Sequence, residues 1–214
     1  MPSIKVVSVI SVVADMLTDE WNVRWPKKTL LRWFNEAQRA LVARRPDALV
    51  VNEPFGCASG PKQALPAKGI RLADVYRNIG GSAITRIDRS VIDAHMRDWY
   101  SHPESAAIQH FVYDERDPKH FYVYPPAEDG AEVELAYTIS PDEVEISDFT
   151  ADSQTIAVDD VYANALQEYM LYKAWMKDAD FAGNSARAQS HFNQFRLAIG
   201  DITQADTIMV PQDG

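Results

Sequence analysis

The sequence predicts an α+β fold, in which an antiparallel helical bundle of about four main helices carries a small antiparallel β-module between its two helical halves. Apolar residues recur at helical spacing near the N-terminus and again beyond residue 155. Between these regions, residues 109–126 read QHFVYDERDPKHFYVYPP, where two aromatic and β-branched runs flank a charged turn with Asp117 and Pro118. Such runs around such a turn are typical of a β-hairpin. The predicted parts are an N-terminal helix pair at 1–46, a β-rich insertion at 47–154, a C-terminal helix pair at 155–200 and an extended tail at 201–214.

The N-terminal half is predicted to be two helices joined by a short loop. Ser3 is a suitable N-cap for the first helix. Pro26 suits the first position of the second helix, which Pro46 ends. In both helices apolar residues recur at intervals of four, three and four, which places them on one face. They are Val6, Ile10, Val13 and Leu17 in the first, and Leu30, Phe34, Ala37 and Leu41 in the second.

The first part of the insertion, residues 47–107, has little periodicity and many prolines and glycines. We expect short strands at Ala48–Val51 and Ala83–Ile87, and strand or irregular structure at Ile70–Ile79. A short helix is expected at Ser90–Trp99.

The rest of the insertion is predicted to hold the strongest β-structure. The hairpin strands are expected at Ala107–Tyr113 and His120–Tyr124. A third strand, Ala131–Ile139, alternates apolar and polar residues as a half-buried strand does. The side chains expected to point inward are Val133, Leu135 and Tyr137.

The C-terminal half follows an acidic loop at Asp142–Gln154 and is predicted to be two helices. An aspartate caps the longest helix, Asp159–Asp178, whose apolar face is broad enough for burial on more than one side. After a break, a last helix is expected to end near Ile199, and the residues beyond it have no evident periodicity.

The net charge of −10 is unevenly distributed. Residues 1–50 carry eight basic and five acidic side chains, whereas residues 114–160 carry two basic and fourteen acidic ones. Affinity for nucleic-acid backbones comes from neutralising phosphates, so an acidic protein is a poor candidate for gripping them. The acidic region is either a solvated surface or one past which nucleic acid slides without adhering.

Three features of the sequence indicate where the protein is located: its apolar runs, its N-terminus and its cysteine content. No apolar run approaches the roughly 18–20 residues that span a bilayer, so we expect no membrane partner. The apolar N-terminus lacks a small-residue cleavage site and is interpreted as an amphipathic helix rather than a signal peptide. Cys57 is the only cysteine, which excludes an internal disulfide and a multi-cysteine metal cluster. An intracellular origin fits these features best.

Motifs for chemistry are sparse. The histidines do not have the spacing of a zinc hydrolase, and a metal site across the hairpin is less favoured than surface histidines. Asp114, Glu115 and Asp117 offer a carboxylate cluster for acid–base chemistry or for a cation, but a water-exposed turn explains them more simply. We therefore predict no catalytic residue, no metal site, no cofactor and no enzymatic activity.

The aromatic content favours an interface. Five tryptophans exceed what one core usually needs in a chain of this size, and tryptophan and arginine are enriched in binding hot spots. The first candidate interface is the loop between the N-terminal helices, with Trp21, Arg24 and Trp25. The second is the hairpin turn, with Asp114, Glu115, Arg116 and Asp117.

Four blocks of sequence resemble the head-to-tail adaptor (connector) proteins of tailed phages, of the short-tailed phage type. They are WNVRWPKKTLLRWFNEAQRALVARRPDA, LPAKGIRLADVYRNIG, HFVYDERDPKHFYVYPP and IAVDDVYANALQEYMLYKAWMKDADFAGNSARAQSHFNQF. Their order and spacing match across about residues 3–200, and the hairpin block and the DDVYANAL helix are the most specific.

The resemblance implies a structural virion protein. Copies of the chain, twelve in number, form a ring that docks under the portal protein, and the β-rich part faces the tail nozzle or tail tube protein. The genome passes through the ring, and an acidic lumen keeps DNA from adhering. The protein then belongs to the virion neck and assembles in the host cytoplasm. The C-terminal segment commonly clasps the portal, which makes the candidate portal-binding residues Asp201, Ile202, Thr207, Ile208, Met209 and Val210.

Two other functions remain open at this point. One is a virion-associated cell-wall hydrolase that uses the acidic residues of the hairpin turn. The other is a helix-turn-helix DNA-binding protein, suggested by the arginines of the second helix. These arginines cluster toward the C-terminal end of the helix, where they complement the helix dipole of any ordinary helix, so the DNA-binding interpretation is the weaker one.

Overall fold

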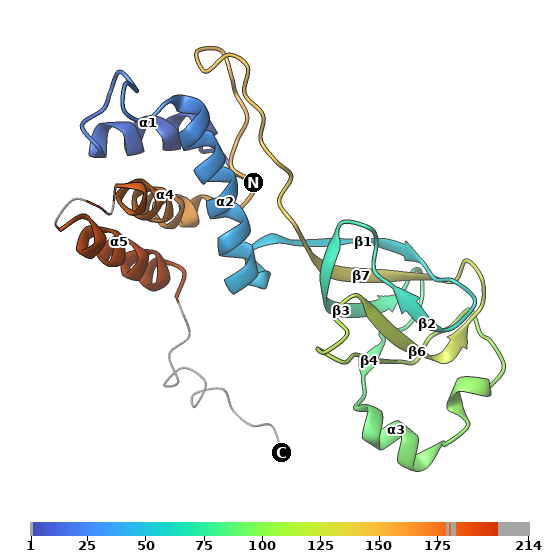
Figure 1. Cartoon of the computed structure of the whole chain (residues 1–214). Coiled ribbons are helices and arrows are strands. Elements are labelled where there is room, and N and C mark those ends of the chain that lie inside the picture. Colours follow the sequence, from blue (N-terminus) through green and yellow to red (C-terminus); the bar gives the residue numbers. More distant parts are fainter. Residues whose placement is uncertain (1, 179, 181–182, 201–214) are drawn as a thin grey trace. The chain divides into compact units, whose positions relative to one another are not determined.

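The computed structural model describes residues 2–178, 180 and 183–200 (Figure 1). The chain divides into two compact units. The first, here called the helical unit, comprises Met1–Ala48 and Pro141–Gly214. The second, here called the β unit, is the continuous stretch Leu49–Ser140.

Four α-helices build the helical unit, and they come from both ends of the chain (blue and orange to red in Figure 1). α4 packs against each of the other three helices, and its buried side chains include Leu166, Met170 and Ala174. This central position explains why its apolar face is broad. α4 and α5 also share T-shaped aromatic contacts, such as Tyr169 on Phe195 at 5.2 Å. The helices are α1 Val6–Met16, α2 Lys27–Arg44, α4 Ala163–Lys177 and α5 Asn184–Ala198.

The start of α1 differs from the expected cap. The helix begins at Val6, and Ser3 lies in an extended segment instead. The Ser3 hydroxyl donates to Asp160 at 2.5 Å, and the Val6 amide donates to the Gln154 carbonyl at 2.9 Å. The N-terminal residues therefore pair with the chain that leads into α4, which ties the two ends of the helical unit together.

The β unit contains seven strands in two sheets. One sheet has the order β1-β7-β3, and the other has the order β2-β6-β5-β4. All pairs are antiparallel except β4 with β5. The strands are β1 Val50–Gly56, β2 Gly60–Ala64, β3 Gly69–Asn78, β4 Thr85–Arg86, β5 His110–Val112, β6 His120–Ala127 and β7 Glu132–Ile139. A short helix, α3 Arg89–His95, and a 3-10 turn, Trp99–Ser101, lie between β4 and β5.

The two sheets share one apolar core. β5 and β6 form the predicted hairpin, in which Phe111 is paired with Val123. β7 is the central strand of its sheet, and its inward residues Val133, Leu135 and Tyr137 are buried as the alternation predicted. Phe121 from β6 is fully buried in the same core. Beside it, Trp99 is fully buried in a smaller cluster with Ile92 and Val112.

The predicted helical bundle with a small β-module is wrong. The described residues form five α-helices and seven strands in two sheets, so the structure is mixed and the β-part has its own large core. The signal was missed because β1 and β2 contain Pro54 and Pro61, which look like loop residues in the sequence. Both strands lie at sheet edges, where a strand tolerates proline.

Candidate partner-binding surfaces

The loop between α1 and α2 is held in shape by one carboxylate. Asp19 accepts hydrogen bonds from the backbone amides of Trp25 at 2.7 Å, Val23 at 2.9 Å and Arg24 at 3.0 Å. Desolvation raises the pKa of Asp19, but these three amides outweigh it, so that this pKa lies below its usual value. The loop is therefore preorganised by an ionised side chain.

This loop exposes two large apolar side chains. Trp21 is 89% exposed and Val23 is 83% exposed. Scattered apolar residues on a surface are common, but a nearly fully exposed tryptophan on an ordered loop is typical of a binding anchor. The arrangement suits contact with another protein.

The other tryptophan of the loop has a different position. Trp25 is only 4% exposed and packs on Trp33 with ring centroids 5.4 Å apart. The Lys177 ammonium lies 5.2 Å from its ring centre, and Arg24 forms an ion pair with Asp178. Trp25 and Arg24 thus attach the loop to the C-terminal end of α4. Among these three candidate residues, Trp21 alone presents its side chain fully to solvent.

The charges of the hairpin turn are paired with one another and with neighbours. Arg116 donates to both carboxylate oxygens of Asp114, which lowers the pKa of Asp114 to about 2. Glu115 forms an ion pair with Arg71 at 3.0 Å, and Asp117 contacts His120 at 2.7 Å. A general acid needs a raised pKa, so Asp114 is poorly suited to that role. The turn is an ordered, charged surface feature.

A second feature of the helical unit is the acidic segment, defined here as residues 142–154. Asn35 of α2 forms two hydrogen bonds to the backbone of Val144, at 2.9 and 3.0 Å. Farther along, Gln38 accepts from the amide of Ala157 at 2.8 Å. Both polar side chains are buried, and sequence reasoning missed them. Their position on α2, next to the apolar residues of its buried face, could have indicated that these side chains are buried and need hydrogen-bond partners.

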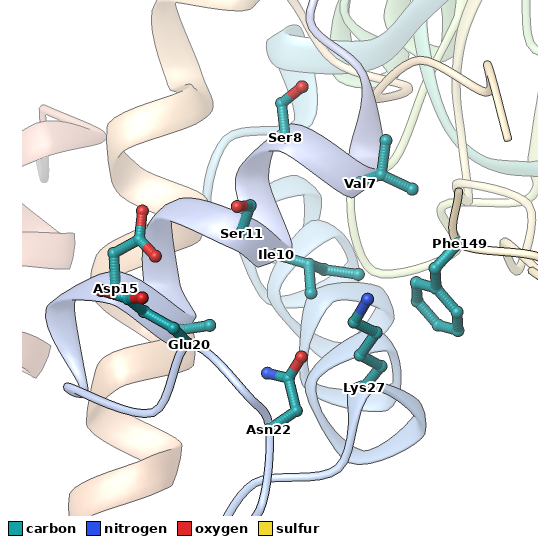
Figure 2. A pocket seen from close by; sticks show the side chains of 10 residues that line it. Val7, Ser8, Ile10, Ser11, Asp15, Glu20, Asn22, Lys27 and Phe149 are labelled. Carbon is teal, nitrogen blue, oxygen red and sulfur yellow. The ribbon is translucent and has the colours of Figure 1, made fainter. Parts of the chain in front are cut away.

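A shallow hollow of about 320 Å³ lies on the outer flank of α1. Figure 2 shows Ser8, Ser11 and Asp15 along the helix, with Lys27 and Phe149 on the facing side. The Lys27 ammonium lies 5.6 Å from the Phe149 ring centre, which attaches the acidic segment to the start of α2. The described residues that line the hollow include no histidine and no cysteine.

The metal-binding and thiol groups of the described residues were considered as possible sites of chemistry. Within the described residues no group of three histidine, cysteine or acidic side chains could hold a metal ion. Burial raises the pKa of Cys57 to about 11, so that the thiolate nucleophile is disfavoured. The candidate portal-binding residues at 201–210 lie outside the described residues.

The exposed loop between α1 and α2 and the charged hairpin turn are surfaces suited to contact with other proteins. A family model described as SU10 adaptor protein matches residues 5–213, and the chain therefore belongs to the SU10 adaptor protein family. This confirms the predicted family, the head-to-tail adaptors of tailed phages, and the SU10 description is consistent with the short-tailed type. A comparison with curated proteins found no significant match.

Membership establishes the role at a coarse level. The protein is a phage adaptor, a structural component of the virion neck that associates with other head and tail proteins. Among the helices described, none has both the length and the apolar character needed to cross a bilayer.

Proposed function

We propose that copies of this chain form a ring between the portal protein and the tail nozzle, through which the genome passes and onto which the tail attaches. The observation that carries the proposal is the adaptor-family match over residues 5–213, which includes nearly the whole chain. The proposed ring has twelve copies, in keeping with the family resemblance.

The exposed loop between α1 and α2 supports a contact role. Its shape is fixed by Asp19 before any partner arrives, so binding through Trp21 does not require the loop to be ordered first. Trp21→Ala is expected to weaken incorporation into virions while leaving the thermal stability of the free protein unchanged. Trp25→Ala is the matched contrast, because Trp25 is buried and its loss destabilises the helical unit.

Two further contacts belong to the proposal. Residues 201–210 bind the portal, with Asp201, Ile202 and the run Thr207–Val210 as the contacting residues. The hairpin turn, Asp114–Asp117, contacts the tail nozzle or tail tube protein. Deleting residues 201–214 should abolish co-purification with portal protein. Reversing the charge of Arg116 should leave portal binding intact and reduce tail attachment.

The alternatives have no comparable support. For the hydrolase, the carboxylates of the hairpin turn are paired, and the pKa of Asp114 is lowered rather than raised. Replacing Asp114, Glu115 and Asp117 by their amides should leave virion-associated lysis unchanged. For the DNA-binding protein, a gel-shift measurement at physiological salt should detect no complex, as the net charge of −10 predicts.

Labelling this chain and imaging the virion neck by electron microscopy tests the proposal directly. The expected result is label at one level, between the capsid vertex and the tail, with rotational symmetry. Label on the tail fibres or inside the capsid would contradict it.

A further inference from the structure

The solvent-facing side of α2 carries three cations in one line. Lys28, Arg32 and Arg39 are spaced by four and seven residues, which places them on one face of the helix over about 16 Å. All three are exposed. We call these three residues the α2 stripe.

None of the three cations of the α2 stripe forms an ion pair within the described part of the chain. The nearest acidic residue on the same helix, Glu36, is already paired with Lys173 of α4 at 2.8 Å. Asn35 lies on the same face of α2, between Arg32 and Arg39, and is covered by Val144 of the acidic segment. The α2 stripe is therefore a narrow, unpaired basic surface on a protein of net charge −10.

The β unit holds a matching unpaired acidic feature. Glu128, Asp129 and Glu132 lie in and beside the turn between β6 and β7, and all three are exposed. Their carboxylates form no ion pair among the described residues, unlike those of the hairpin turn. We call these three residues the β6–β7 acidic turn.

The backbone of the β6–β7 acidic turn is fixed. The Gly130 amide donates to the Cys57 carbonyl at 3.0 Å, and the Cys57 amide donates to the Ala131 carbonyl at 2.8 Å. Gly130 has a φ of 77°, which favours glycine, so the turn is built for this conformation. Three carboxylates are thus presented on a rigid support.

We propose that the α2 stripe of one copy docks on the β6–β7 acidic turn of a neighbouring copy. The inference rests on the proposed ring, and it specifies which surfaces join adjacent copies. Two different surfaces of the same chain in contact make a heterologous interface, which is the type that generates rings. Charge complementarity of three cations with three carboxylates selects the partner and its orientation.

Nucleic acid is the weaker partner for the α2 stripe. Three cations neutralise at most three phosphates, so they supply little of the counterion release on which phosphate binding depends. Exposed Glu143 and Glu145 flank Val144, which lies against α2, and they repel a polyanion that extends beyond the stripe.

A charge-swap experiment on the full-length protein tests the proposal. The stripe variant is Lys28→Glu, Arg32→Glu, Arg39→Glu, and the turn variant is Glu128→Lys, Asp129→Lys, Glu132→Lys. Sedimentation equilibrium at low salt and high protein concentration should show association of the wild type. Each variant alone should associate about 100-fold more weakly, because like charges then face each other. An equimolar mixture of the two variants should associate like the wild type, because every contact is again between opposite charges.

A matched control separates local pairing from net charge. Lys5→Glu, Arg97→Glu, Lys119→Glu changes the net charge by the same amount at exposed positions outside the α2 stripe. It should associate within about threefold of the wild type. Circular dichroism of every variant establishes that the fold is retained.

Several results would overturn the inference. They are wild-type protein that stays monomeric at low salt, association that neither variant weakens, and a mixture that fails to recover. Stripe-dependent retardation of DNA by monomeric protein would assign the stripe to nucleic acid instead. The proposed ring is tested separately, by imaging the virion neck. If a symmetric ring is seen there and the charge swap fails, this interface is excluded but the proposed function is not.

Discussion

The two units of the molecule differ in how the chain builds them. The β unit is one continuous stretch of chain, and its sheets enclose an apolar core with Phe121, Val133 and Leu135 fully buried. The helical unit also buries apolar side chains such as Phe34, but it is assembled from two distant stretches, which hydrogen bonds such as those of Asn35 to Val144 and Ser3 to Asp160 join. The β unit therefore contains all of its packing partners within one stretch of chain, whereas the helical unit requires both of its stretches.

The largest expected difference between the units concerns folding in isolation. Residues 49–140 expressed alone should fold cooperatively, because their core residues all lie within that stretch. Residues 1–48 alone should stay largely unfolded, since α1 and α2 lose the surface of α4 on which they pack. Circular dichroism and thermal melts measure both. Adding residues 141–200 to residues 1–48 should restore helicity, and an isolated β unit without a melting transition would contradict the comparison.

A second prediction uses one buried phenylalanine in each unit. Phe121→Ala and Phe34→Ala each remove a fully buried ring, and each should cost about 3–5 kcal/mol of unfolding free energy. If the units are energetically separate, Phe121→Ala lowers the transition of the β unit and Phe34→Ala that of the helical unit. Calorimetry combined with a tryptophan fluorescence melt distinguishes the two transitions. A single transition lowered equally by both substitutions would show that the units unfold as one.

The sequence predicts the two units unequally, for a physical reason. Helix periodicity located α2 and α4 well, because the 3.6-residue period persists through every turn of a helix. The hairpin of β5 and β6 and the central strand β7 were also evident from aromatic runs and alternation. β2 was not predicted, and β1 was predicted only at its start, within the strand expected at Ala48–Val51, because edge strands tolerate prolines such as Pro54 and Pro61.

The candidate surfaces show the same limit. Sequence reasoning selected Trp21 and Trp25 as equivalent loop residues, yet one is exposed and the other is buried against Trp33. The loop folds around Asp19 through the backbone amides of residues 23–25, and an irregular loop of this kind has no periodic pattern from which the two tryptophans could be told apart. Asn35 and Gln38 were overlooked because their partners lie more than a hundred residues away in the chain.

The polar attachments of the helical unit provide a third, smaller effect. Asn35→Ala leaves the amide and carbonyl of Val144 without their partner and should cost about 1–3 kcal/mol. Gln38→Met should cost less, because the buried Nε2 group of Gln38 has no hydrogen-bond partner among the described residues. The substitution removes this unsatisfied donor together with the one hydrogen bond that Gln38 accepts from Ala157. Urea titrations of both variants measure the difference. An equal or larger loss for Gln38→Met would contradict the assigned roles.

The smallest effect is a pH dependence that belongs to the helical unit. Because the pKa of Asp19 is below its usual value in the folded protein, the unfolded chain takes up this proton first as the pH falls. The contribution of Asp19 to stability is then complete well above the unfolded value of about 3.9 and is lost as the pH falls through the lower folded value. Asp19→Asn should melt a few degrees below the wild type at pH 7, and the difference should shrink as the pH falls below the usual carboxyl range. Asp129→Asn, which removes an exposed carboxylate that forms no ion pair among the described residues, is the control for the loss of one negative charge and should melt like the wild type at pH 7. A gap between wild type and Asp19→Asn that stays constant from pH 7 to pH 2.5 would mean that the loop is held by its packing on Trp25 rather than by the ionised carboxylate.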